Sequence, residues 1–306
     1  MRQKAIFMVL GFKAFKLKEA LVICSAPRSG STWLIEMLSK FPEIIINWEP
    51  IHSTKGVVPN KRYLGERPFI EKDEDNGQLF TFFKNVFCFK RFNTWTTRYA
   101  AFKIALKSKK VVTKFVRANP LLPYFAHNFG LKYKPILLVR HPVPTCQSII
   151  KAFGNQTREL LNFEPPETLN NERFMPHVEY INQLQTRLEQ QIALWCIDNV
   201  DVVETKDPQN WHLIPYEAMM ANPIDTLKDI SNLWHLKVNK NTFKAIAIDK
   251  PSRTTYKGDL RKDPKSQIEK YLEVLTNEEL DRIQAIFNYF GLKYYKAHHP
   301  YPLDNY

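Results

Sequence analysis

The amino-acid sequence predicts a three-layer α/β/α fold built around a central, mostly parallel sheet. Short apolar runs rich in β-branched residues alternate along the chain with segments of helical periodicity, an order typical of a parallel sheet covered by helices. The runs are apolar throughout, which indicates strands that are buried on both faces. No repeat and no linker separates two such series, so we expect a single domain over residues 1–306.

Five segments are predicted to be strands. They are Ala20–Ser25, Ile44–Trp48, Val111–Phe115, Pro135–Val139 and Trp211–Pro215. Three long segments without periodicity are expected to be loops. They are Ser53–Gly77, Gly154–Pro176 and Lys250–Ser266.

Helices are predicted where apolar residues recur at i, i+3, i+4 and i+7. The first covers Ser31–Phe41, and one long helix carries apolar residues on one face from Val178 to Trp195. Asn222–Trp234 begins with an N-cap residue followed by proline at the first helical position. The last helix begins at the capping box Thr276–Glu279 and stops at Gly291.

The positive charge of the chain is concentrated in one block. The chain has 44 Lys and Arg against 31 Asp and Glu, a net charge of +13. Residues 76–158 contain 15 of these basic residues and no acid, so the remainder holds 29 basic and 31 acidic residues. Such a block indicates an anionic partner.

Composition excludes several classes of protein. Charged residues at 25% with 13% aromatics argue against disorder, and no apolar stretch approaches the ~18 residues of a transmembrane segment. Met1–Lys18 lacks the cleavage site of a signal peptide, but its apolar run among basic residues permits peripheral contact with a membrane surface.

The four cysteines indicate buried thiols. Cys24, Cys88, Cys146 and Cys196 lie 50 or more residues apart, a spacing that fits neither a zinc site nor a disulfide framework. The simplest interpretation is core thiols in a reducing, cytoplasmic setting.

The segment Leu21–Leu34 (LVICSAPRSGSTWL) predicts an anion site where a buried strand runs into a helix. Backbone N–H groups and the helix dipole favour negative charge there. Ser31 and Thr32 add hydroxyl donors, and Arg28 adds a cation that can grip phosphate or sulfate oxygens. The alternative is a Ser/Thr-capped helix with a solvated Arg28. The G-x-x-x-x-G-K-[ST] pattern is absent, which argues against an ATP-dependent kinase.

The segment Lys134–Phe153 repeats this arrangement. Its strand ends in Arg140, and Ser148 lies within the helix that follows. Both side chains could converge on a second phosphate. The alternative is an ordinary strand, proline turn and helix with Arg140 on the surface.

Together the two segments resemble motifs of sulfotransferases that use 3′-phosphoadenosine 5′-phosphosulfate (PAPS). Ala26–Leu34 resembles the 5′-phosphosulfate loop, and Val139–Pro142 with Ser148 resembles the 3′-phosphate motif. Three further segments resemble the carbohydrate (Golgi-type and bacterial) branch of the family. They are Trp48–His52, Ile192–Asn199 and Ile214–Pro223 with Leu233. The matches keep the family's order from Val22 to about Leu292.

The resemblance implies a P-loop-like nucleotide-binding architecture and sulfuryl transfer from PAPS to an acceptor hydroxyl, without a metal. The acceptor it implies is a saccharide or glycolipid. It assigns PAPS binding to Arg28, Ser29, Gly30, Ser31, Thr32, Trp33, Arg140 and Ser148, with Arg253 and Lys257 from a late loop. The cytosolic branch has lysine at the position of Arg28, whereas arginine matches the carbohydrate branch. An arginine cannot donate its proton at neutral pH, so its expected role is electrostatic.

The acceptor hydroxyl needs a base, and two residues qualify. Glu49 follows the second strand, beside the expected sulfuryl position, and belongs to the family's Glu-Pro segment. His52 lies three residues further on and has an ordinary pKa better suited to the task. A structural role for both, with Glu49 in a salt bridge, is the remaining alternative.

A second function class also fits the charge. A basic nucleic-acid-binding protein without catalysis would account for the acid-free block, but the sequence contains no helix-turn-helix, zinc or ribonucleoprotein motif. Two strand-end phosphate motifs favour a discrete nucleotide, and we expect no nucleic-acid partner. The other cations of the block, from Lys84 to Lys134, exceed what one cofactor uses, so they suggest an anionic acceptor.

Overall fold

The computed structural model describes residues 2–60, 62–153, 162–166, 169–205, 210–246, 252–253 and 263–303. Its central sheet consists of β1 (Leu21–Ser25), β2 (Ile44–Trp48), β3 (Lys110–Val116), β4 (Ile136–Val139) and β5 (His212–Pro215). The strand order is β2-β3-β1-β4-β5, and every neighbouring pair is parallel. The predicted fold class is confirmed, and each predicted strand is present with small shifts at its ends.

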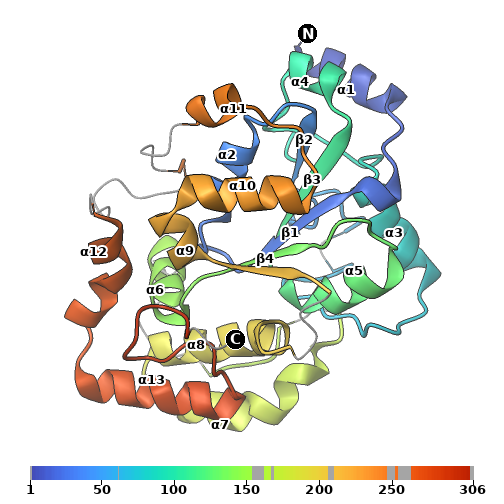
Figure 1. Cartoon of the computed structure of the whole chain (residues 1–306). Coiled ribbons are helices and arrows are strands. Elements are labelled where there is room, and N and C mark those ends of the chain that lie inside the picture. Colours follow the sequence, from blue (N-terminus) through green and yellow to red (C-terminus); the bar gives the residue numbers. More distant parts are fainter. Residues whose placement is uncertain are drawn as a thin grey trace.

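Helices cover both faces of the sheet, giving three layers (Figure 1). One face packs against α3 (Gly77–Phe87), α5 (Leu122–Asn128), α6 (Pro142–Phe153), α8 (Arg187–Val203) and α13 (Asn277–Phe290). The other packs against α2 (Ser31–Leu38), α9 (Tyr216–Ala221) and α10 (Pro223–Leu233). Alternate residues of β1 serve the two layers, since Val22 and Cys24 lie in one core cluster and Leu21 and Ile23 in the other.

The remaining elements flank these layers. They are the helices α1 (Arg2–Phe12), α4 (Phe102–Lys107), α7 (Val178–Gln183), α11 (Lys240–Lys244) and α12 (Pro264–Glu269) and the 3-10 turns Leu17–Glu19, Asn119–Leu121, Asn171–His177 and Lys270–Glu273. Helices α1 and α4 pack on Ile45 and Val111, next to the edge strand β2. Nowhere in the described part of the chain is a helix long and apolar enough to span a bilayer.

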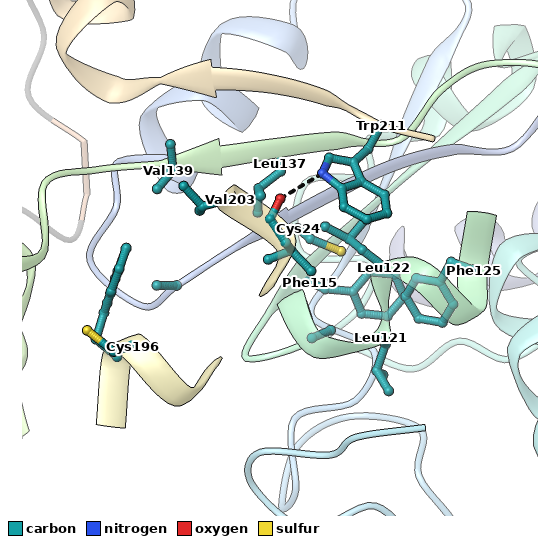
Figure 2. Close-up of a cluster of buried hydrophobic side chains, with 14 of the residues drawn as sticks. Cys24, Phe115, Leu121, Leu122, Phe125, Leu137, Val139, Cys196, Val203 and Trp211 are labelled. Atoms are coloured by element: carbon teal, nitrogen blue, oxygen red, sulfur yellow. Dashed lines mark hydrogen bonds between the residues drawn. The ribbon is translucent and has the colours of Figure 1, made fainter. Parts of the chain in front are cut away.

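The larger core cluster contains many aromatic rings and the thiols of Cys24, Cys146 and Cys196. Figure 2 shows part of it, including Cys24 and Cys196. Trp211 donates from Nε1 to the backbone oxygen of Val202 over 3.0 Å, so its one polar atom is satisfied inside the core. All four cysteines are buried and free, as predicted. Burial raises the pKa of the Cys24 and Cys146 thiols far above their ordinary value.

The prediction of one long helix from Val178 to Trp195 is wrong. The chain leaves helical geometry at Leu184, where ψ is 144°, and α8 starts after Thr186. Thr186 and Glu189 form a reciprocal capping box, which satisfies the free N–H groups of a new helix. The apolar spacing continues through the break because both helices pack on the same core.

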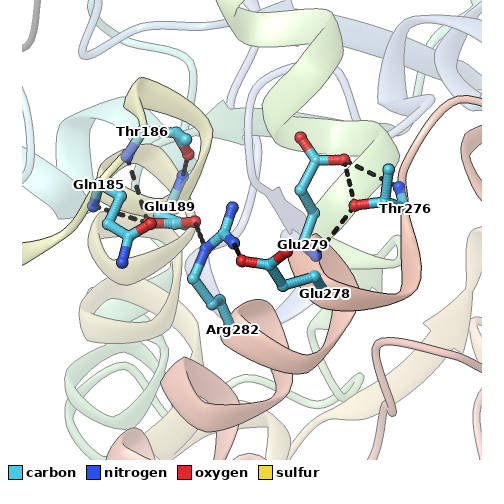
Figure 3. A network of polar contacts seen from close by, with 7 residues as sticks. All are labelled: Gln185, Thr186, Glu189, Thr276, Glu278, Glu279 and Arg282. Carbon is cyan, nitrogen blue, oxygen red and sulfur yellow. Dashed lines mark hydrogen bonds and ion pairs between the residues drawn. The ribbon is translucent and has the colours of Figure 1, made fainter.

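A second capping box, Thr276 with Glu279, begins α13 as predicted, and Gly291 ends it with φ of 74°. Arg282 of α13 donates from Nε to Glu189 over 2.9 Å and from a terminal nitrogen to Glu278 over 3.0 Å. Figure 3 shows how this arginine connects the start of α8 to α13. The contact fixes two helices of the same layer against each other.

Two predicted helices differ only at their ends. Helix α2 ends at Leu38, short of the predicted Phe41, and α10 ends at Leu233, one residue before the predicted Trp234. Asn222 precedes α10 as predicted, but its side chain makes no capping hydrogen bond.

The strand order places the predicted phosphate-binding arginines beyond the carboxyl ends of the strands. After β1 the chain passes toward β2, whereas after β4 it passes toward β5 on the other side. Loops that diverge from adjacent parallel strands leave a crevice beyond their carboxyl ends. The loops after β1 and β4 carry Arg28 and Arg140.

Candidate active site

A cavity of about 1150 Å³ opens at the carboxyl edge of the sheet. Residues after β1, β2, β3 and β4 all contribute to its wall. Its basic lining residues are Arg28, Lys55, Arg98, Lys114, Arg117, Arg140, Lys151 and Lys270. Only Glu49 and Glu66 oppose them among the lining residues that the structure describes, so the wall favours an anionic ligand.

Three charged residues of this wall have left-handed backbone geometry. Their φ angles are 67° for Arg28, 41° for Glu49 and 69° for Arg117. Glu49 and Arg117 directly follow β2 and β3, and Arg28 lies three residues beyond β1. A non-glycine residue in this region costs roughly 1–2 kcal/mol, and such residues concentrate at functional sites. The fold therefore holds these three residues in costly conformations.

The two predicted phosphate segments meet. Arg28 Nε donates to Ser148 Oγ of α6 over 2.9 Å. A terminal nitrogen of Arg140 donates to the backbone oxygen of Arg28 over 3.2 Å. Residues more than 100 positions apart thus form one corner of the cavity. Binding of a second phosphate by Arg140 and Ser148 stays a prediction.

The loop after β1 leads directly into α2. Gly30, with φ of 85°, precedes the first helical residue Ser31, and no side chain caps the helix. A Cβ at Gly30 would lie 2.4 Å from the Tyr216 ring, so this position accepts only glycine. Ser29 Oγ is buried and has no hydrogen-bond partner in the described part of the chain. Ser31, Thr32 and Trp33 line the cavity, whereas Ser29 is not a lining residue.

The two residues that follow β4, Arg140 and His141, have different surroundings. The Arg140 guanidinium lies 4.7 Å from the Tyr216 ring centroid and faces the cavity. His141 is buried, stacks on Tyr271 at 4.8 Å and approaches the backbone oxygen of Lys296 at 3.1 Å. Burial lowers the pKa of His141 to about 3, so this imidazole is a neutral part of the frame.

Glu49 forms an ion pair with Lys114 of β3. Lys114 is 1% exposed, and its ammonium lies 3.9 Å from the Trp48 ring centroid. Burial lowers the pKa of Lys114, and Glu49 opposes that shift. Only Oε1 of Glu49 meets Lys114, while no described residue donates to Oε2. The salt bridge weighed for Glu49 in the sequence is therefore present, and the carboxylate also lines the cavity.

His52 lines the cavity on the same side. The backbone N–H of Thr54 donates to its Nδ1 over 3.3 Å, and the ring packs edge-on against Trp95 at 5.1 Å. Partial burial lowers the pKa of His52. Because Nδ1 accepts the hydrogen bond from Thr54, the neutral ring carries its proton on Nε2, which is then a donor rather than a base.

The acid-free block divides between the cavity and the outer surface. Within it, the basic residues that line the cavity are Arg98, Lys114, Arg117, Arg140 and Lys151. Other cations of the block pair elsewhere, such as Lys109 with Glu43 at 2.5 Å. Between Lys84 and Lys134, only Arg98, Lys114 and Arg117 among the described residues are cations that can face an acceptor in the cavity.

Two predicted cofactor residues remain apart from the cavity wall or outside the described residues. Arg253 points to Glu36 of α2 at 3.7 Å and is not a lining residue, although its neighbour Ser252 is. Lys257 lies outside the described residues. The cofactor roles of Arg253 and Lys257 stay predictions.

Sequence reasoning missed Lys114, Arg117 and Tyr216. Lys114 had a signal, because it is a single charge inside a strand expected to be buried on both faces. Arg117 follows its strand as Arg140 follows β4, so the rule used for Arg140 would have found it. Tyr216 lies in the Ile214–Pro223 segment that resembles the family, but no local pattern indicates its contact with Gly30.

A family model for the sulfotransferase domain matches residues 18–253. The chain belongs to the sulfotransferase family. The match covers the loops after β1, β2, β3 and β4 that form the wall of the cavity. No curated protein sequence matches this sulfotransferase significantly.

Solved structures with a related fold include other sulfotransferases. Mouse sulfotransferase SULT7A1 complexed with PAP is 16% identical with a TM-score of 0.49, and the match covers 94% of this chain and 90% of that one. The sulfotransferase domain from the Synechococcus PCC 7002 olefin synthase is 15% identical with a TM-score of 0.43, covering 90% and 94%. A sulfotransferase from Alicyclobacillus acidocaldarius is 14% identical with a TM-score of 0.40, covering 88% and 95%.

Proposed function

We propose that this sulfotransferase moves the sulfuryl group of PAPS to a hydroxyl of an anionic saccharide or glycolipid. The observation that carries the proposal is the junction of Arg28, Arg140 and Ser148 in the same cavity as the Glu49–Lys114 ion pair. At about 1150 Å³, the cavity exceeds the roughly 300–1,000 Å³ of single-ligand pockets. It therefore has room for a nucleotide and part of an acceptor.

The residues present suit a sulfated nucleotide. Ser29 Oγ is a buried hydroxyl without a described partner in the loop that precedes α2. Gly30 has no side chain, so a ligand can approach its backbone closely. No side chain caps the start of α2, so its first N–H groups can donate to an anion. Arg28 and Arg140 supply two permanent charges. We assign PAPS binding to this loop with Arg140 and Ser148.

In the proposed reaction PAPS supplies the sulfuryl group, which leaves the bridging oxygen of its 5′-phosphate for the acceptor oxygen. Arg28 stabilises the negative charge that develops on the leaving phosphate, and its contact with Ser148 holds the guanidinium in place. Because Arg28 keeps its proton, its contribution is electrostatic.

Glu49 takes the proton of the acceptor hydroxyl. Its Oε2 has no described partner, whereas Oε1 is fixed by Lys114. Lys114 acts as a positioning residue, because a carboxylate held at one oxygen presents the other in a defined direction. His52 is the weaker candidate, since its Nδ1 already accepts the N–H of Thr54.

The acceptor class follows from the cations of the cavity wall that are not assigned to PAPS. Arg98 and Lys55 lie 4.8 and 4.9 Å from the Trp95 ring centroid in the cavity wall. The Arg117 side chain also lines the cavity and forms no ion pair or hydrogen bond with any described residue. An aromatic surface flanked by free cations suits a sugar that carries carboxylate or sulfate groups. Together with arginine at position 28, this favours membership of the carbohydrate branch.

The decisive experiment is transfer of labelled sulfate from PAPS to a panel of uronate-bearing, sulfated and neutral glycans, glycolipids, phenols and sterols. We expect the anionic saccharides or glycolipids to accept label, and Glu49→Gln to slow transfer about 100-fold or more. Glu66→Gln, which changes the other acid of the cavity wall, is the matched control and should retain turnover. Full turnover in Glu49→Gln would reassign the base to His52.

A ligand-binding measurement separates this function from nucleic-acid binding. Adenosine 3′,5′-bisphosphate should raise the melting temperature in the wild type and in Glu49→Gln, whereas ATP with magnesium should do little. Nucleic-acid binding would instead weaken steeply with salt. No shift at saturating bisphosphate would contradict the nucleotide site.

A further inference from the structure

Helices α1 and α4 lie side by side at the end of the molecule that carries the N-terminus (Figure 1). Gln3 Nε2 donates to Thr97 Oγ1 over 2.7 Å. Lys13 Nζ donates to the backbone oxygens of Leu106 and Ser108, each over 2.7 Å. These contacts join residues 93 to 95 positions apart. The two segments therefore run in the same direction, with Met8 level with Phe102 and Phe12 level with Leu106.

The outer surface of this pair is apolar. Met8 is 66% exposed, Phe12 88%, Phe102 39% and Leu106 51%. They are half of the large hydrophobic side chains that lie exposed in the described residues, the others being Phe153, Met175, Val274 and Tyr289. The inner residues Ile6, Leu10 and Ala105 already fill the core beneath. The four outer side chains lie outside this core cluster, and together they form a patch of the kind that marks an interaction site.

The surface around these four side chains is basic. Lys4, Lys103 and Lys107 are exposed and pair with no carboxylate in the described part of the chain. Residues 1–18 and 76–158, which include both helices, contain no Asp or Glu. Exposed phenylalanine and leucine surrounded by unpaired lysines is the composition of a helix that lies in a membrane interface.

We propose that the α1–α4 surface docks on an anionic lipid bilayer. Phe12, Met8, Phe102 and Leu106 would enter the boundary between headgroups and acyl chains, while the lysines meet lipid phosphates. At 11 residues α1 is too short to span a bilayer. A second copy of the chain is a poor occupant, because its lysines would face those of the first copy. This docking involves neither the cavity nor its nucleotide.

The test is co-sedimentation of the full chain with phosphatidylcholine vesicles, with and without phosphatidylglycerol. We expect binding to the anionic vesicles that weakens with salt. Phe12→Ser should weaken it about tenfold, and Lys103→Glu with Lys107→Glu by at least as much. The matched control is Met175→Ser, a residue 61% exposed on a distant 3-10 turn, which should bind as the wild type does.

Three outcomes would overturn the proposal. One is the absence of binding to anionic vesicles. A second is equal binding by wild type and Phe12→Ser, whose side chain is too exposed to affect folding. The third is a solution dimer that Phe12→Ser dissociates in sedimentation equilibrium, which would assign the surface to a second copy of the chain.

Discussion

The two sides of the cavity are built differently. On the Arg28 side, the half-buried Arg28 and Arg140 lie in loops and the half-buried Ser148 lies in the middle of α6. Hydrogen bonds join Arg28 to each of the other two. On the Glu49 side, Glu49 and Lys114 form an ion pair at the ends of adjacent strands, and the lysine is fully buried. Charges near water tolerate change, whereas removing one partner of a buried pair leaves an uncompensated charge. Substitutions on the Arg28 side should therefore mainly change ligand affinity and the stabilisation of charge in the reaction. Substitutions on the Glu49 side should mainly change the orientation of the reacting groups.

The largest effect should come from Arg28→Ala. We expect sulfate transfer to fall about 1,000-fold or more in single-turnover assays, because no other residue is assigned to the charge on the leaving phosphate. Arg28→Lys should recover part of the rate, since it restores the charge without the contact to Ser148. If Arg28→Ala lowered the rate of sulfate transfer less than tenfold, other cations would stabilise the leaving phosphate. The two sides of the cavity would then not differ in the way described above.

The Lys114→Met variant tests the Glu49 side. We expect turnover about 100-fold slower with unchanged affinity for adenosine 3′,5′-bisphosphate, because Glu49 loses the contact that orients it. The double variant Glu49→Gln/Lys114→Met should be no slower than Glu49→Gln alone, since both changes remove one function. Additive losses would show that Lys114 acts on the reaction independently of Glu49.

The frame behind the Arg28 side should respond to pH. The pKa of His141 is about 3 in the folded chain, against roughly 6.5 when unfolded. Below pH 6.5 only the unfolded chain takes up this proton, so stability falls as the pH decreases toward 3. Between pH 7 and pH 5, His141 should lower the free energy of unfolding by about 2 kcal/mol. Urea denaturation at both pH values measures it, and His141→Gln should show a smaller loss.

The smallest effect should come from Arg140→Ala and Ser148→Ala. Each should weaken binding of adenosine 3′,5′-bisphosphate about tenfold by calorimetry, because one contact to a charged group is lost. The chemical step should change less, as neither residue is assigned to it. Unchanged affinity in both variants would remove the 3′-phosphate assignment and leave the binding role to Arg28 alone.

The fold was predictable because its strands are continuous apolar runs. All five were found, since a strand buried on both faces needs little information beyond its own composition. The break between α7 and α8 was missed, because apolar periodicity continues across Leu184. The Thr186–Glu189 capping box was a readable signal of the new helix start.

The candidate site was predictable where its residues follow strands along the chain. Arg28, Arg140 and Ser148 lie together because the carboxyl ends of adjacent parallel strands meet. The partner of Glu49 was not identified, because Lys114 reaches it through the register of β2 and β3. Strand order is a long-range property that no local pattern contains.

The left-handed backbone geometry of Arg28, Glu49 and Arg117 affects how the protein could be made more stable by selection. Glycine at any of these positions would relieve up to about 1–2 kcal/mol of backbone cost. A library screened for heat resistance alone should therefore accumulate glycine at positions 28 and 117 and lose two charged groups of the cavity. At Glu49 glycine would leave the buried Lys114 unpaired, which costs more than the backbone relief. Stabilising substitutions therefore have to be sought elsewhere in the chain, because at Arg28 and Arg117 backbone stability and the charge of the cavity place opposite demands on one residue.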